Sequence, residues 1–220
     1  AGVHMWLDLT SFTFFVLLTG RFGPAEHAAS NIALAINSLA FMPTLAVGQA
    51  ATVVVGQYQG RGRSDLARRA GWSALALAAG YMGAIALTYV AVPDLYIALF
   101  TDRGPGAVPH AEVAPIARRL LWMLAIWSTG DATDLALAGA LKGAGDTRFV
   151  MGYSLVMAYG LFVGGLVVIV HWLGGGLYAA WAWCCMYILA MGVGYIARFV
   201  RGRWASIRVL QAPSARELPR

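Results

Sequence analysis

The chain alternates between long apolar runs and short connections that are polar and mostly basic. Each run reaches or exceeds the roughly 20 residues that an α-helix needs to cross the hydrocarbon core of a bilayer. The pattern therefore predicts an all-α membrane protein, a single six-transmembrane-helix bundle over residues 1–200 with a basic tail at 201–220. We expect the six spans at about residues 1–20, 28–56, 70–92, 117–141, 149–172 and 177–197.

Two of the connections carry further structural signals. The short apolar piece Leu95–Thr101 is expected to lie at the membrane interface, ahead of a loop from Asp102 to Pro115 that is rich in Gly and Pro. The triplet Gly174–Gly176 is expected to form the turn between the last two spans. Pro43 should bend the second span, because proline lacks the backbone N–H that an inner helical turn requires.

Composition agrees with a membrane class and excludes several others. The chain is 60% hydrophobic and 12% charged, whereas soluble domains carry about 25% charged residues. The net charge of +6 comes from short basic runs between apolar segments, a pattern that predicts topology and no nucleic-acid partner. Cys184 and Cys185 have no neighbouring His or acid, and no HExxH motif or Ser/Lys dyad is present, so neither an enzyme nor a metal or other cofactor is expected.

The basic residues also predict orientation. Alternate connections and the tail hold 12 of the 16 Lys and Arg residues, six of them from Arg198 onward. An excess of this kind marks the cytoplasmic side of a cell (inner or plasma) membrane, so both ends of the chain are expected there. Trp122 and Trp172 then fall at the outer interface, and Trp72 and Trp204 at the inner one, as membrane anchors would.

The fourth span carries the residue that the membrane makes most costly. Asp131 lies 12 residues from Arg119 and 11 from Lys142, so it is expected roughly 17 Å from either charged end, near the bilayer midplane. A carboxylate at that depth costs about 3 kcal/mol or more unless it faces protein or water, which favours a functional role. A packing aspartate held by hydroxyl groups is the alternative. Asp134 follows at i+3 and could be either a packing residue or part of a wet vestibule.

The first span carries a second deep acid. Asp8 lies 13 residues before Arg21, roughly 20 Å from the outer face, which is similar in depth to Asp131. If the two helices face each other, burial and mutual repulsion would favour binding of a proton or a small cation such as Na⁺. Asn37 is the further candidate, for substrate or vestibule, because it lies in apolar sequence near Pro43; most such polar residues only bond a neighbouring helix.

Three stretches resemble the multidrug and toxic compound extrusion (MATE) transporters. The sequence NIALAINSLAFMPTLAVGQAATVVVGQYQGRG is similar to the helix and loop that open the second half of that family. DATDLALAGALKGAGDTR resembles its tenth helix and following loop, and RFVRGRW resembles the close of its twelfth. The resemblance implies one C-terminal lobe of a twelve-helix, alternating-access antiporter that exports drugs or other organic, often cationic, compounds in exchange for H⁺ or Na⁺.

The resemblance also implies roles and partners. The family's tenth-helix aspartate corresponds to Asp131, and its seventh-helix acid, usually Glu, corresponds to Asp8, a shorter side chain that leaves the ion preference open. The expected partners are the lipid bilayer, a small organic substrate and an N-terminal six-helix lobe, unless two copies of this chain pair instead. The alternative function is a lipid-linked oligosaccharide flippase of the same superfamily, in which a basic cavity would be expected; here the deep charges are acidic.

Overall fold

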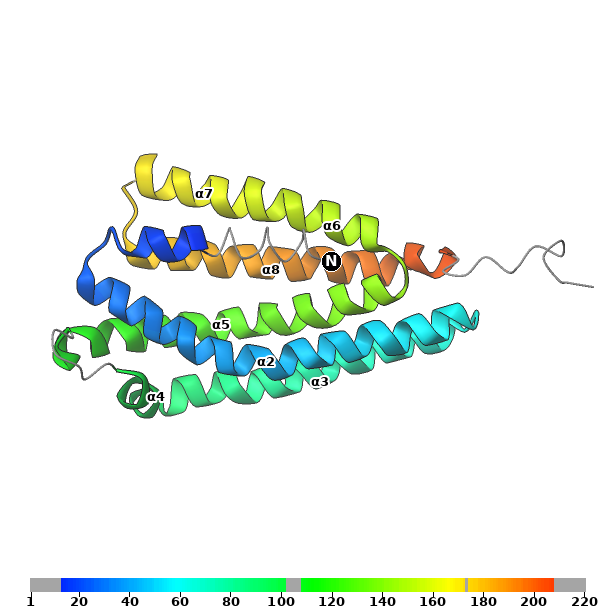
Figure 1. The fold of residues 1–220 in the computed structure, drawn as a ribbon, viewed down its shortest axis with the longest axis horizontal. Coiled ribbons are helices and arrows are strands. Elements are labelled where there is room, and N and C mark those ends of the chain that lie inside the picture. The colour runs from blue at the N-terminus through cyan, green and yellow to red at the C-terminus, as the bar shows by residue number, and fades with distance from the viewer. Residues whose placement is uncertain (1–12, 102–107, 173, 208–220) are drawn as a thin grey trace, which may run out of the picture.

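The computed structural model describes residues 13–101, 108–172 and 174–207 as an elongated bundle of helices running back and forth along one axis (Figure 1). A short helical segment at 13–19 comes first, and the described part of the chain contains no strand. Most of the predicted first span, including Asp8, lies outside the described residues, as does most of the predicted tail.

Two long helices follow the first turn. α2 runs from Pro24 to Gly60 and α3 from Ser64 to Ala91, so both extend beyond the apolar cores expected from the sequence. Figure 1 shows α2 changing direction partway along its length. Pro43 lies inside this helix, and we attribute the bend to it. Proline has no backbone N–H to donate to the preceding turn, and its ring clashes with the carbonyl group there.

α4 and α5 differ from the sequence expectation in one respect. α4 occupies Pro93–Phe100, close to the short apolar piece, whereas α5 runs from His110 to Gly143 and so begins inside the predicted loop. Val113 and Ala117 are fully buried, one helical turn apart, and this apolar spacing continues the helix upstream of the expected span. Pro115 is tolerated because it lies in the second turn, close to the helix start.

The last two helices form a hairpin. Residues 147–172 form one continuous helical rod, divided into α6 (Thr147–Leu155), the π-helical η1 (Val156–Val163), α7 (Gly164–Val167) and the π-helical η2 (Val168–Trp172). α8 returns from Leu177 to Arg201, and a 3₁₀ turn, η3, covers Arg203–Ser206. Gly174 lies in this hairpin with φ +62°, a left-handed conformation that suits glycine.

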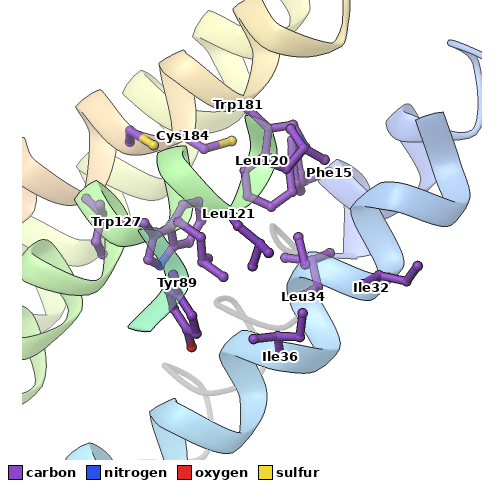
Figure 2. Close-up of a cluster of buried hydrophobic side chains, with 14 of the residues drawn as sticks. Phe15, Ile32, Leu34, Ile36, Tyr89, Leu120, Leu121, Trp127, Trp181 and Cys184 are labelled. Carbon is purple, nitrogen blue, oxygen red and sulfur yellow. The ribbon is translucent and has the colours of Figure 1, made fainter. Parts of the chain in front are cut away.

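α5 is the centre of the bundle. It packs against α2, α3 and α8, and it lies between α8 on one side and α2 with α3 on the other (Figure 1). Close to its N-terminal half, Trp181 of α8 is fully buried, with its ring 5.5 Å from Phe15 and 6.2 Å from Trp127. Figure 2 shows these rings beside Leu120 and Leu121 of α5. This apolar cluster joins the first segment, α2, α5 and α8.

Four of the described helical segments are long and apolar enough to cross a membrane: Pro24–Gly60, Ser64–Ala91, Thr147–Trp172 and Leu177–Arg201. α5 has the length, but its arginines and aspartates lower its mean hydropathy. Of the tryptophans expected at the interfaces, Trp122 and Trp172 are exposed and Trp72 partly so, whereas Trp204 is buried and so does not face the lipid as an anchor would. Trp204 is buried because the chain turns back after Gly202 and stacks it on Phe199.

Candidate functional site

The candidate site lies where α5 meets α2, and about two helical turns beyond Asp131 the two helices approach each other closely. A Cβ on Gly139 would collide with the carbonyl oxygen of Gly48, and one on Gly143 would collide with that of Thr52. The Thr52 hydroxyl lies 3.0 Å from the carbonyl oxygens of both Gly48 and Gly139, so it can donate to either. Small residues four positions apart thus let the two backbones touch, as in close transmembrane packing.

Asp131 is buried in the middle of this assembly. Its side chain is on α5, the residue is 4% exposed, and its Oδ2 lies 3.5 Å from Nδ2 of Asn37 on α2. Among the described residues, no Lys or Arg forms an ion pair with it. The structure therefore brings together Asn37 and Asp131, two of the residues singled out from the sequence. The buried carboxylate has a neutral donor at the long limit of hydrogen-bonding distance.

Two buried polar atoms beside Asp131 lack partners among the described residues. They are Oδ1 of Asn37, an acceptor, and Nε1 of Trp127, a donor. Trp127 precedes Asp131 by four residues, which places both side chains on one face of α5. A buried polar atom without a hydrogen bond costs about 1–3 kcal/mol, so such atoms point to a bound species or to an alternative arrangement of the site.

α8 closes the site on the other side. A Cβ on Gly130 would collide with Ile188 of α8, and one on Gly192 would lie 3.2 Å from Thr133 of α5. These glycines let α8 approach the segment of α5 that carries Asp131. Asp134, one turn further along, is only partly buried. Asp8 lies outside the described residues, so its predicted position beside Asp131 is not observed.

Sequence reasoning did not single out Trp127 as a site residue. The signal was present in its i−4 spacing from Asp131, but an aromatic residue at helical spacing is usually core, and here the indole ring does pack against Trp181. Among the described residues there is also no cluster of three or more His, Cys, Asp or Glu side chains that could hold a metal ion. A pocket of about 510 Å³ lies elsewhere, where the start of α2 meets α4 and α5; His27 and Asn31 line it.

Comparison with solved structures supports the architecture. The fold superposes with a TM-score of 0.74 on an outward-facing multidrug resistance MATE family transporter of the MOP superfamily, at 16% identity, covering 97% of this chain and 46% of that one. A MOP superfamily transporter from Pyrococcus furiosus, described as having a binding pocket of reversed polarity, gives a TM-score of 0.64 at 17% identity, covering 94% and 43% of the two chains. The chain thus has the fold of part of these two proteins.

Sequence comparison gives the family. Residues 1–167 match the MatE family, and this chain belongs to it. Probable multidrug resistance protein NorM of Brucella suis biovar 1 (strain 1330) is 34% identical over 198 residues, covering 90% of this chain and 40% of the relative. NorM of Mesorhizobium japonicum is 30% identical over 205 residues, covering 93% and 42%.

Family membership confirms the resemblance inferred from the motifs and places the protein among membrane transporters rather than enzymes. The chain spans about two fifths of the length of these curated relatives.

Proposed function

We propose that this chain forms the C-terminal six-helix half of a cation-coupled antiporter that exports drugs or other organic compounds by alternating access. Membership of the MatE family and similarity to NorM proteins support export as the activity. The share of the relatives that the chain covers fits one of two lobes, with the substrate cleft between them and a second six-helix lobe as the partner. On this proposal the protein lies in the cell membrane with both chain ends cytoplasmic.

The coupling site in this proposal is Asp131 together with Asp8. One observation carries it: a buried carboxylate that faces an amide and an indole and has no cationic partner among the described residues. Such a group is stable only when a proton or a small cation neutralises it, or when the site opens to water. Exchange of that positive charge for the substrate would couple ion entry to export.

Asn37 suits either charge state of Asp131. Its Nδ2 can donate to an ionised carboxylate, whereas its Oδ1, which has no partner among the described residues, can accept from a protonated carboxyl group or contact Na⁺. Trp127 Nε1 is a donor only, so it would stabilise the ionised state. The proposal covers either H⁺ or Na⁺ as the coupling ion, and the imposed gradient that drives export in the experiment below identifies which one it is.

A flippase for lipid-linked oligosaccharides would need basic side chains in its cavity to hold pyrophosphate. Among the described residues, the buried charged ones are Asp131 and Asp146, both acidic. The acidic site therefore favours the antiporter.

The test is transport by the full-length transporter containing this chain, reconstituted in proteoliposomes under an imposed proton or sodium gradient. Asp131→Asn preserves shape and removes the charge, so it should abolish gradient-driven export while leaving the membrane level intact. Asp94→Asn is the matched control, because Asp94 is exposed and pairs with Arg118 at the helix ends. The Asp131 assignment is wrong if Asp131→Asn exports at the unaltered rate under the same gradient.

A further inference from the structure

Exposed arginines gather at one end of the bundle, where α3 begins and α8 ends. Arg68 and Arg69 lie in the second turn of α3, and Arg201 is the last residue of α8; all three are exposed. Arg68 Nη2 donates to the carbonyl oxygen of Val200 at 3.1 Å, and Val200 directly precedes Arg201 in the chain. Arg68 thus lies against the end of α8 that carries Arg201, and Arg69 follows it on α3.

Acidic residues near this cluster are already engaged. Asp65, one turn before Arg68 and Arg69, forms an ion pair with Arg63 at 3.1 Å. Asp146 is held by Arg198 at 2.7 Å. In the described part of the chain, no carboxylate forms an ion pair with any of the three clustered arginines, so their charge remains available for a mobile anion.

The cluster adjoins a surface suited to a lipid rather than to a soluble anion. Trp72 follows Arg68 by four residues on the same face of α3, is 38% exposed, and packs edge-on against Phe199 of α8 at 5.6 Å. An indole one turn below arginines is typical of the membrane interface, with the cations at headgroup level. Along α8, the exposed side chains Val193, Ile196 and Val200 extend from this point toward the bundle centre, where acyl chains would lie.

We propose that Arg68, Arg69 and Arg201, beside Trp72, bind the phosphate headgroup of an anionic phospholipid. Guanidinium groups match phosphate oxygens in geometry as well as in charge. The contact between Arg68 and Val200 and that between Trp72 and Phe199 hold α3 and α8 together, so the bound lipid would bridge two helices that are far apart in sequence. This site depends on membrane insertion and not on the coupling role of Asp131.

The test is native mass spectrometry of the purified protein titrated with phosphatidylglycerol or phosphatidylcholine. We expect phosphatidylglycerol to bind at least about tenfold more tightly. The triple variant Arg68→Gln, Arg69→Gln, Arg201→Gln should lose this preference. A matched triple at the same end, Arg61→Gln, Arg148→Gln, Arg203→Gln, removes equal charge from other exposed arginines and should retain it.

Equal loss of preference in both triples would show diffuse attraction and overturn the site, as would absence of a preference in the unaltered protein. Competition by soluble glycerol phosphate at millimolar concentration would overturn the lipid assignment. If the Gln triple does not fold, the single change Arg201→Gln replaces it and should weaken phosphatidylglycerol binding severalfold. Unchanged binding in that variant contradicts the proposal.

Discussion

Arg198 of α8 donates two hydrogen bonds to Asp146, which immediately precedes α6: Nε to Oδ2 at 2.7 Å and Nη2 to Oδ1 at 3.1 Å. The Asp146 side chain is only 6% exposed, and the Arg198 guanidinium also lies over the Phe149 ring. This pair explains why the sequence GAGDTR holds an acid so close to the membrane. It fixes the α5–α6 connection to the end of α8.

Asp146→Asn should destabilise the fold, because it removes the charge that compensates a half-buried guanidinium. We expect a loss of about 1–3 kcal/mol in the free energy of unfolding, since breaking one side of a charge-assisted pair leaves the other unsatisfied. Unfolding in detergent micelles measures it. The double variant Asp146→Asn, Arg198→Gln should lose less than the sum of the single losses. Additive losses would mean that the pair contributes no coupling energy.

Gly139→Ala should separate α2 from α5, because the new methyl group would meet the Gly48 carbonyl oxygen. Overpacking of this kind costs about 1–3 kcal/mol. Gly80→Ala is the matched control: it lies within α3 with nothing within 4 Å of a new Cβ, so it should be neutral or slightly stabilising. Thermal unfolding of the two variants side by side tests the close approach; equal midpoints would contradict it.

Asn37→Leu should impair coupled export by about tenfold or more in the full-length transporter, because a buried carboxylate would lose its amide neighbour. Ser38→Ala is the control, since the Ser38 hydroxyl donates to Leu34 of its own helix. Both variants should reach the membrane at normal levels. Gradient-driven uptake into inverted vesicles distinguishes them, and equal export by the two would remove Asn37 from the site.

Topology can be tested by cysteine labelling in intact cells. A cysteine replacing Arg61, exposed in the α2–α3 connection, should react only with a permeant reagent, and one replacing Ala111, exposed at the start of α5, should also react with an impermeant one. Cys184 and Cys185 are buried, so background labelling should be low. Reaction of both positions with the impermeant reagent would contradict the proposed orientation.

The apolar pattern predicted an all-α membrane fold because each described span keeps its backbone hydrogen bonds inside one helix, which a bilayer requires. It did not predict where α5 begins, since Pro109 and Pro115 read as loop signals, whereas buried Val113 shows that packing against the core decided the outcome. The burial of Trp204 was also missed, because it depends on the turn after Gly202, which is set by tertiary contacts.

At the site, depth along the helix made Asp131 a candidate, and the structure places it buried between helices, while its depth in the membrane stays a prediction. The sequence made Asn37 a candidate without predicting that it lies next to Asp131. Which residues of α2 and α5 face each other depends on how the two helices pack, including the contact between Gly48 and Gly139, and not on either helix alone. Which atoms of Asn37 and Trp127 lack a partner among the described residues could not be predicted, since this depends on side-chain orientation.

The backbone contact between α2 and α5 also limits how this part of the molecule can move. At Gly48 and Thr52, α2 lies so close to α5 that one methyl group added to Gly139 or Gly143 would collide with its backbone. Asn37 lies on the other side of Pro43 from that contact. A bend of α2 at Pro43 would therefore change the distance between Asn37 and Asp131 while this backbone contact stays closed, so the proline divides α2 into a part fixed to α5 and a part that can tilt.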